Sequence, residues 1–227
     1  MIRSPHNTVI MHKSLVQDVV EYIESLILSG ELSPGERLIE QVMCDRFQVS
    51  RSPLREAFRI LENQGFLVNK ARKGVFVREV SKKEAIDIYV IRANLESLAT
   101  LLAVQKDDGS LAVNLKEMHR QMLCCAEEGD SWKYTELNRE FHEVLISSCG
   151  NERLIEMLRV FSKQTFRYRS EVMRVPGKME ESLRKHEMLI ESIERGDAVE
   201  AERLCKEAIL ANTALLEKVF SSGENRV

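Results

Sequence analysis

The stretch PGERLIEQVMCDRFQVSRSPLREAFRILENQGFLVNKARKGVFV, residues 34–77, decides the fold of the first part of the chain. A short helix is predicted around Ile39–Arg46, and the connection FQVS leads from it into a second helix. Pro53 suits the first turn of that second helix, where no backbone donor is needed, and Gly65 suits its C-terminal end. The segments FLVN and GVFVREV then indicate two short β-strands around the basic loop KARKG. Helix, turn, helix and hairpin in this order predict a winged helix-turn-helix unit.

A third helix is predicted before this stretch, between Lys13 and Ser29. Its apolar residues recur on one side, and the glycines and proline of SGELSPGERL end the pattern. That apolar side consists of Leu15, Val16, Val19, Ile23, Leu26 and Ile27. In the helix after FQVS, either Ser50 or Ser52 can act as the N-terminal cap. The residues of that helix expected to point inward are Leu54, Ala57, Phe58 and Leu61.

Charge is distributed unevenly along the chain. Lysine and arginine number 33 against 36 aspartates and glutamates, so a net charge of -3 does not by itself indicate a nucleic-acid-binding protein. Residues 1–45, however, carry three basic and seven acidic residues, whereas residues 46–78 carry eight basic and two acidic residues. A local basic block in an acidic chain is what a phosphate-facing surface needs, because each contacted phosphate must find a positive group.

The basic block includes the N-terminal end of the second helix of the predicted unit. In such units this end enters the major groove of DNA, where arginine can bind the acceptor edge of guanine. The expected DNA contacts are Ser50, Arg51, Ser52 and Arg55, together with the wing-loop residues Lys70, Arg72, Lys73 and Gly74. Arg59 lies one turn deeper and faces a phosphate or pairs with Glu56 or Glu62. The alternative is an ordinary solvated helix face, but the ordered combination of turn, capped helix, hairpin and basic tip favours DNA binding.

Residues 34–77 closely resemble the GntR superfamily of bacterial winged-helix transcription regulators. The usual family pattern is PGxxLxExxLAxxLGVSRTPVREALxxLxxEGLVxxxxxxGxxV, and this segment follows it without gaps. Phe47 and Gln48 stand where Leu-Gly is common, and Ser52 replaces the usual threonine but keeps the hydroxyl. The resemblance implies that Arg51 and Arg55 are the main DNA-contacting residues. It also implies a DNA contact for Gln41 on the preceding helix, as in some relatives.

From Ser81 onward the pattern is helical, and Ser81 with Glu84 forms a capping box at its start. Stop signals such as DDGS, EEGDS and VPGK separate the helices. Six helices are predicted, at 82–105, 110–127, 130–149, 151–173, 178–195 and 197–220. We therefore predict a mainly α protein of two domains. Residues 1–80 form the winged unit with three helices and a two-stranded hairpin, and residues 81–227 form an antiparallel bundle of about six helices for effector binding and dimerisation.

The second domain resembles the helical effector domain of the FadR-like subfamily. The matching segments are YVIRANLESLA, LNREFHEVLISSCGNERL and KHEMLIESIERGDAVEAERLCKEAI. Many such domains bind a divalent metal through an Asp or Asn, a His four residues later and two further histidines. The resemblance places Asn138, His142 and His186 at three of these positions but Ala208 at the last. Imidazole suits Zn, Ni or Mn, but the set is incomplete, so we expect a polar effector pocket lined by these residues rather than a metal centre.

Arginines add to the expected effector site. By resemblance, Arg92, with Glu96 one turn on, lies near a position where an arginine meets an acidic effector. The predicted effector-binding residues are therefore Arg92, Asn138, His142 and His186. Arg167 and Arg169 are weaker candidates, which we expect to pair with glutamates instead.

Together these features predict a homodimeric transcription regulator rather than an enzyme. It binds a two-fold operator on double-stranded DNA, and a small metabolite, a carboxylate by resemblance, changes its affinity. Two alternatives are a metal-dependent hydrolase built on His142 and His186 and a helical interaction adaptor with a vestigial DNA-binding head. The hydrolase lacks an evident general base and a third strong ligand.

The remaining sequence features concern the compartment. The five cysteines are scattered without a Cys-x-x-Cys pair, which indicates neither a disulfide framework nor a zinc knuckle. No apolar run is long enough to span a bilayer, and MIRSPHNTVIMHK lacks the features of a secretory signal. We expect a cytoplasmic protein without membrane association.

Overall fold

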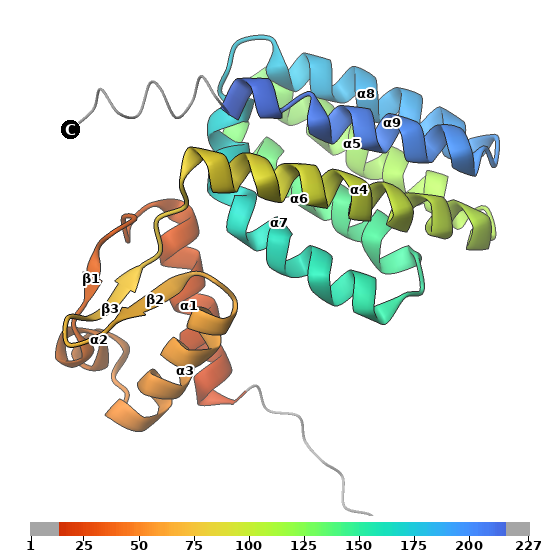
Figure 1. Ribbon diagram of the computed structural model, residues 1–227. Coiled ribbons are helices and arrows are strands. Elements are labelled where there is room, and N and C mark those ends of the chain that lie inside the picture. The colour runs from red at the N-terminus through yellow and green to blue at the C-terminus, as the bar shows by residue number, and fades with distance from the viewer. Residues whose placement is uncertain (1–13, 217–227) are drawn as a thin grey trace, which may run out of the picture. The chain divides into compact units, whose positions relative to one another are not determined.

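The computed structural model describes residues 14–216, without the side chains of Phe166, Arg167 and Ser170. The chain divides into two compact units, Met1–Glu79 and Val80–Val227 (Figure 1). Each unit has its own hydrophobic core. Among the described residues, no helix combines the length and the apolar character needed to cross a bilayer.

The N-terminal unit contains the three predicted helices, α1 (Leu15–Ser29), α2 (Glu40–Phe47) and α3 (Arg51–Asn63). Ser14 caps α1, because its side chain accepts a hydrogen bond from the backbone N of Gln17 at 3.2 Å. Both α1 and α3 bury apolar faces in one core, and all four residues predicted to point inward from α3 are buried. Leu15, predicted on the apolar face of α1, is instead exposed.

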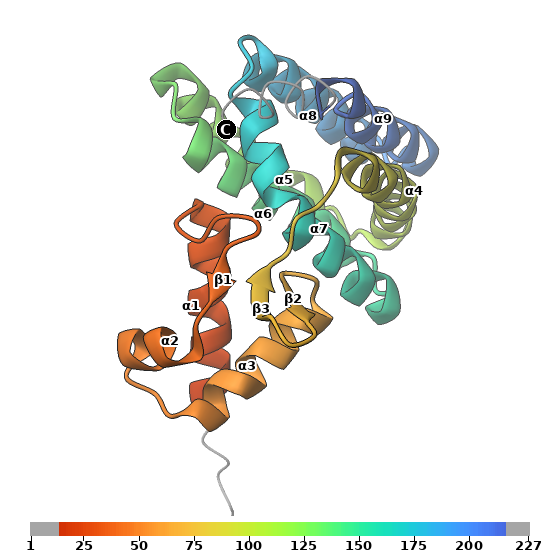
Figure 2. The same ribbon diagram turned by 60° about the vertical axis from the view of Figure 1, so that its left-hand side comes forward.

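The connection between α2 and α3 is short (Figure 2). Gln48 ends α2 with a φ of 54°, a left-handed conformation that glycine adopts more easily. This conformation explains why the family pattern favours glycine at the position that Gln48 occupies in this chain. Ser50, not Ser52, is the N-cap residue of α3, although by position only, since its side chain makes no capping hydrogen bond. Gly65 follows the last turn of α3 with a φ of 77°.

The sheet of this unit has three strands rather than the predicted two. They are β1 (Arg37–Leu38), β2 (Leu67–Lys70) and β3 (Gly74–Val77), in the antiparallel order β1-β3-β2. The hairpin β2–β3 was predicted, whereas β1 is too short to show an alternating pattern. Its pairing places Arg37 opposite Phe76 and so brings a residue from before α2 next to the wing.

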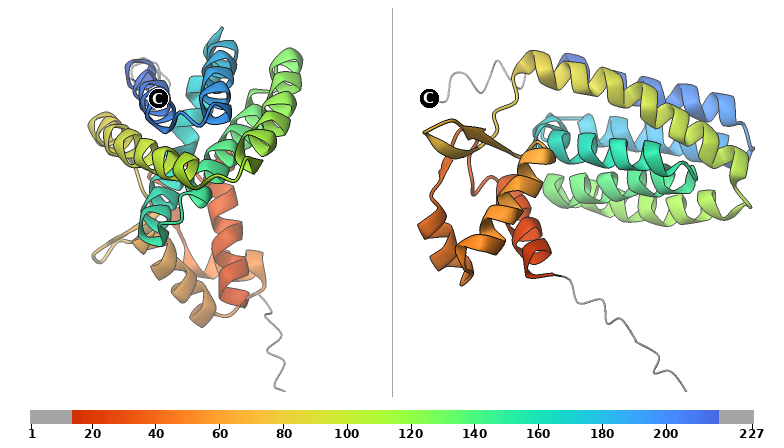
Figure 3. Two further views of the ribbon diagram at one scale, coloured as in Figure 1. Left: turned by 90° about the vertical axis from the view of Figure 1, so that its right-hand side faces the viewer. Right: turned by 60° about the horizontal axis from the view of Figure 1, so that its bottom comes forward.

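The C-terminal unit contains, among the described residues, six helices that run roughly along one another (Figure 3). They are α4 (Lys82–Lys106), α5 (Ser110–Glu128), α6 (Ser131–Ser148), α7 (Glu152–Met173), α8 (Lys178–Glu194) and α9 (Ala198–Leu210). The bundle therefore confirms the predicted fold class. The last helix was predicted to reach residue 220, but α9 ends at Leu210, a turn follows at 211–212, and 213–216 are helical again. Residues 217–220 lie outside the described part.

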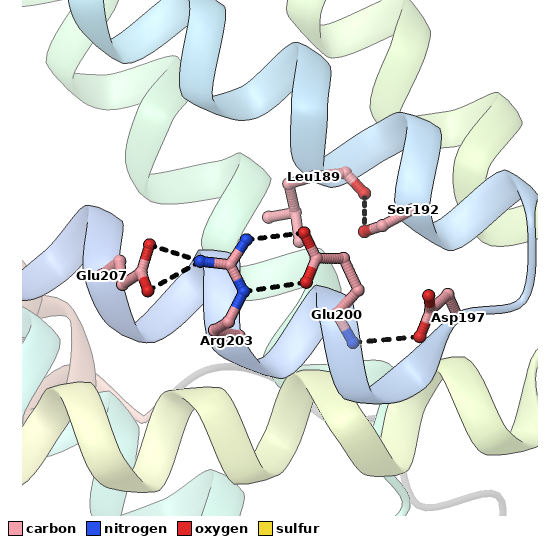
Figure 4. A network of polar contacts seen from close by, with 6 residues as sticks. All are labelled: Leu189, Ser192, Asp197, Glu200, Arg203 and Glu207. Carbon is pink, nitrogen blue, oxygen red and sulfur yellow. Dashed lines mark hydrogen bonds and ion pairs between the residues drawn. The ribbon is translucent and has the colours of Figure 1, made fainter.

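Local polar contacts define the start and the outer face of α9 (Figure 4). Asp197 caps the helix through the backbone N of Glu200 at 3.0 Å. Arg203 pairs with Glu200 at 2.6 Å and with Glu207 at 2.7 Å. On neighbouring α8, the buried Ser192 hydroxyl donates to the carbonyl of Leu189 at 2.7 Å. The arginine network is exposed, so it contributes little to stability.

Candidate functional site

The arginines at the start of α3 are exposed and held by side chains of α2. Arg51 Nη2 donates to Gln41 Oε1 at 3.0 Å. Arg55 donates from Nε and Nη2 to the two carboxylate oxygens of Glu40, at 2.9 and 2.8 Å. The predicted pair of arginines and Gln41 thus lie together on one surface. Glu40 was not predicted as part of it, because nothing in the sequence links it to Arg55 before the two helices pack.

The Arg55–Glu40 pair has a clear electrostatic signature. The hydrogen bonds from Arg55 hold the pKa of Glu40 below its ordinary value. The side chains of Arg55 and Glu40 are 59% and 35% exposed, so water and salt screen their attraction. Such a pair orients the guanidinium but does not bind it irreversibly, since a phosphate or a base edge can replace the carboxylate.

The other residues predicted on α3 also face solvent. Ser50, Ser52 and Arg59 are all exposed. Glu62, one of the two carboxylates considered as a partner of Arg59, accepts a hydrogen bond from the backbone N of Asn69 at 3.2 Å and so links α3 to β2. Arg59 is exposed on the same face of α3 as Arg51 and Arg55, which precede it at four-residue spacing.

The wing is a tight basic loop between β2 and β3. Lys70 pairs with Gly74 across the hairpin, and the backbone N of Lys73 donates to the carbonyl of Lys70 at 2.9 Å. Arg72 has a φ of 61° and Gly74 a φ of 102°, so both adopt left-handed conformations at the tip. Lys70, Arg72 and Lys73 are exposed. Their ammonium and guanidinium groups give the wing a positive tip.

Arg37 is a further basic residue at the wing that the sequence did not predict. A Cβ atom on Gly74 would lie 3.4 Å from Nε of Arg37, so the arginine side chain passes directly beside the glycine. This contact depends on the pairing of β1 with β3. The absence of a side chain at Gly74 therefore gives Arg37 room beside the wing.

The four residues predicted for effector binding line a single pocket in the bundle. Arg92 comes from α4, Asn138 and His142 from α6, and His186 from α8. All four are buried, and the cavity has a volume of about 30 Å3. The pocket is also lined by Arg169, Met173, Lys178, Ser182, Lys185, Ala208, Ile209 and Asn212. Helices far apart in the sequence therefore converge on one small polar cavity.

Glu96 is the acidic centre of this region. Arg92 Nε donates to Glu96 Oε2 at 2.8 Å, and His142 Nδ1 lies against the other carboxylate oxygen. Burial alone would raise the pKa of Glu96, but Arg92 and His142 together lower it below its ordinary value. Glu96 is thus an anion at neutral pH, and it fixes the positions of Arg92 and His142.

The two histidines are neutral side chains inside the pocket. Their ring centroids lie 5.5 Å apart, and the ring of Phe141 lies 4.4 Å from that of His186. Burial lowers the pKa of His142, an effect that Glu96 partly offsets. Burial also lowers the pKa of His186, to well below the ordinary value, and His142 adds to this effect. Both imidazoles are therefore uncharged at neutral pH.

Arg169 corrects a prediction. It was expected to pair with a glutamate, but it is buried in the pocket wall, and Nη1 and Nη2 have no hydrogen-bond partner among the described residues. Burial, and secondarily the charge of Arg92, lowers the pKa of Arg169 to about 10, so it stays cationic at neutral pH. The side chain of Arg167 lies outside the described part of the structure.

Lys178 is a second pocket cation that was not predicted. It is buried, and its Nζ lies 3.2 Å from Glu181, which also pairs with Lys185. Its position at the start of α8, after Gly177, shows no pattern that distinguishes it from a surface lysine. Only the packing of α8 turns it toward the cavity.

The predicted metal ligands do not form a complete metal site. Asn138, His142 and His186 converge, but Ala208 supplies no donor, so the predicted set is reduced to two imidazoles and a neutral amide. No cluster of three or more His, Cys, Asp or Glu side chains suited to a metal ion occurs within residues 14–216. Two guanidinium groups, of Arg92 and Arg169, also line the cavity and repel a cation. The donors present therefore do not fit a divalent metal.

A winged helix-turn-helix unit followed by a helical bundle with an internal polar pocket defines a protein of the helix-turn-helix regulator class. The profile described as "Bacterial regulatory proteins, gntR family" matches residues 15–77, and that of the FCD domain matches residues 87–211. The chain belongs to the GntR family of bacterial regulatory proteins and carries an FCD domain. The predicted family is thus confirmed.

Relatives support the same assignment. The chain is 33% identical over 137 residues to the HTH-type transcriptional regulator YdhC of Bacillus subtilis, an alignment that covers 60% of this chain and 61% of YdhC. It is 35% identical over 142 residues to the Nta operon transcriptional regulator of Aminobacter aminovorans, covering 61% of this chain and 66% of that protein. The matched region thus spans less than two thirds of either relative. Both names describe transcriptional regulators rather than enzymes.

Solved structures share the fold over nearly the whole chain. Escherichia coli McbR/YncC matches with a TM-score of 0.80 at 23% identity, covering 92% of this chain and 100% of that one. A GntR regulator from Rhodococcus sp. RHA1 matches with a TM-score of 0.71 at 21% identity, covering 89% and 97%. At these identities the likeness establishes the fold.

Proposed function

We propose that the protein is a homodimeric transcription regulator of the cytoplasm that binds a DNA operator and releases or tightens it when a small carboxylate occupies the bundle pocket. The observation that carries the proposal is the pair of exposed arginines at the start of α3, held by α2 beside a basic wing. This is the arrangement that reads a major groove.

The DNA contacts follow from the chemistry of arginine. The N-terminal end of α3 enters the major groove, where the forked donors of Arg51 and Arg55 reach O6 and N7 of guanine or a phosphate. Gln41 and Glu40 hold the two guanidinium groups extended before DNA arrives, which reduces the entropy lost on binding. Further contacts from Ser50, Ser52 and Arg59 to the sugar-phosphate backbone of DNA hold α3 in the groove. Lys70, Arg72, Lys73 and Gly74 place the wing on the neighbouring phosphates.

In the proposed function, ligand binding in the bundle pocket regulates the affinity of the protein for its operator. Arg92, Asn138, His142 and His186 offer a charged and hydrogen-bonding surface to an acidic ligand. The ligand changes operator affinity only if it binds the DNA-competent arrangement of the dimer more or less tightly than the other arrangement. The apolar side chains Val90, Ile91 and Leu98, all more than 35% exposed on α4, support contact with a second copy.

The test is DNA binding by purified protein on its own promoter region. An Arg51→Ala, Arg55→Ala double variant is expected to bind at least about 100-fold more weakly, since it loses two forked contacts. An Arg120→Ala, Arg203→Ala double variant removes the same charge from exposed positions of the bundle and is the matched control. The parent protein should also show a steep loss of affinity with salt. Equal binding by both double variants would overturn the proposal, and no salt-dependent shift at all would favour the adaptor alternative.

A further inference from the structure

The buried guanidinium of Arg169 is a pocket feature to which the proposed regulation of DNA binding assigns no role. Arg169 is 3% exposed, and its Nη1 and Nη2 have no hydrogen-bond partner within the described residues. Its neighbour Arg92 is equally buried but is bonded to Glu96 at 2.8 Å. A charge that is removed from water without a counter-charge is strongly unfavourable, so the site favours any anion that reaches it.

The net charge of the buried side chains around the pocket is positive, which also favours an anion. The buried cations are Arg92, Arg169 and Lys178, and the buried anion beside them is Glu96. Glu181, the partner of Lys178, is 38% exposed and lies at the surface rather than in the cavity. The neutral imidazoles of His142 and His186 add hydrogen-bonding groups but no charge. The two guanidinium groups therefore exceed the buried carboxylate by one charge, and Lys178 adds a further positive charge.

Position 208 shows why a metal ion does not supply the attraction for an anion here. The FadR-like pattern has a histidine at this position, whereas Ala208 lines the cavity with a methyl group. One turn further along, Asn212 presents an amide whose Oδ1 is buried without a partner in the described structure. Ala208 thus removes one imidazole ligand, while Arg169 already provides positive charge in the cavity.

The cavity also limits the size of the group that enters. Its volume of about 30 Å3 holds two or three waters or one small oxyanion group. Lys185, Ala208 and Asn212 are partly exposed, so they form the rim, whereas Arg92, His142 and His186 are buried. A ligand therefore places its anionic head in the cavity and the rest of its skeleton at the rim.

We propose that this pocket binds its ligand without a metal ion, and that Arg169 is the residue that binds the oxyanion head group, a carboxylate or a phosphate. The proposal rests on the proposed function only in treating the bundle pocket as the ligand site. Arg169 donates two hydrogen bonds from Nη1 and Nη2 to the head group. Arg92 stays with Glu96 and contributes its charge.

The first experiment measures thermal unfolding of the full chain in EDTA, with acetate or inorganic phosphate titrated to millimolar concentrations against chloride of equal ionic strength. A ligand that binds only the folded state raises the Tm. We expect the Tm to rise with acetate, with phosphate or with both, and the active anion identifies the head group. In Arg169→Gln the apparent affinity should fall at least about tenfold. The matched control is Arg203→Gln, an exposed arginine of the same unit, which should respond like the parent.

A second readout distinguishes loss of binding from loss of folding. Removing an unpaired buried charge should raise the Tm of Arg169→Gln above that of the parent in the absence of anion. An anion response that needs added zinc, an undiminished response in Arg169→Gln, or no response in the parent would each overturn the proposal. If Arg169→Gln does not fold, Arg169→Lys replaces it, since it keeps the charge but loses the forked pair of donors and should still bind the anion more weakly.

Zinc titrated alone by calorimetry tests the metal directly. The parent should show no stoichiometric binding in the pocket, whereas Ala208→His, which adds the third imidazole, should bind zinc more tightly than the parent. Stoichiometric binding by the parent that is lost in His186→Gln would contradict the proposal. None of these assays contains DNA. A failed operator-binding test therefore does not change the result of the anion and zinc assays, and failure of those assays does not change the result of the operator-binding test.

Discussion

Two arginine–glutamate pairs of this protein have the same contact distance and opposite environments. Arg55 and Glu40 meet at 2.8 Å on the surface of the N-terminal unit that we propose faces DNA, where their side chains are 59% and 35% exposed. Arg92 and Glu96 meet at 2.8 Å inside the bundle, where they are 3% and 1% exposed. Because water screens the first pair and not the second, equal geometry does not mean equal energy.

The difference separates two uses of arginine. In the exposed pair, the carboxylate of Glu40 on α2 positions the guanidinium of Arg55 on α3, and in the proposed function DNA replaces this carboxylate. In the bundle the carboxylate is a permanent counter-charge, without which Arg92 would be as unbalanced as Arg169. The exposed pair is therefore suited to recognition, and the buried pair to holding a polar pocket in place.

The largest expected effect comes from breaking the buried pair. Glu96→Gln leaves Arg92 without its paired anion, and removal of one partner of a buried pair costs about 3–5 kcal/mol. Urea unfolding followed by circular dichroism measures the change in the free energy of unfolding. Glu117→Gln, which removes an exposed partner of Arg120, is the control and should leave the midpoint unchanged.

The pH dependence of unfolding provides a second test of the Arg92–Glu96 pair. The pKa of Glu96 in the folded state is below its ordinary value near 4.5, so its stabilising effect is complete above that pH and is lost as the pH falls toward the folded-state pKa. The stability difference between the parent and Glu96→Gln should therefore shrink below about pH 4.5. A difference that is constant down to the acid transition would mean that the Glu96 charge does not stabilise the fold.

A smaller effect is expected from the exposed pair, and on DNA binding rather than on stability. Glu40→Gln removes a negative charge near the phosphates and frees Arg55, so affinity for any duplex should rise about threefold to tenfold. The preference for the operator over unrelated DNA should fall, because Arg55 is no longer held in one orientation. Fluorescence anisotropy with the two duplexes measures both values. A loss of stability comparable to that of Glu96→Gln would refute the comparison between the pairs.

Much of the fold could be predicted because its signals are local. The apolar residues of α3 recur at helical spacing. Ser81 caps α4 as predicted, since Ser81 Oγ accepts from the backbone N of Glu84 at 3.2 Å. Strand β1 was not predictable, because two residues carry no period and their pairing with β3 joins positions far apart in the sequence. For the same reason, the position of Arg37 beside the wing could not be predicted from the sequence.

The pocket shows a similar limit. Asn138 and His142 share a helix face by their spacing, and family resemblance added Arg92 and His186, so these four could be placed together in advance. Arg169 could not, because an arginine on α7 has the same sequence pattern whether it faces a glutamate, solvent or a cavity. Its orientation is set by the packing of α7 against α4, which is a tertiary property.

The smallest expected effect is on α9, where Arg203 bonds to both Glu200 and Glu207 (Figure 4). This arginine has more ionic contacts than Arg92, yet it is 51% exposed, so its contacts exchange with water at little net cost. Arg203→Ala should therefore leave the Tm within about 2 °C of the parent value, and the difference should vanish at high salt. A salt-independent loss approaching that of Glu96→Gln would show that the number of contacts, not burial, sets the energy of these pairs. Calorimetry at two salt concentrations decides between these outcomes.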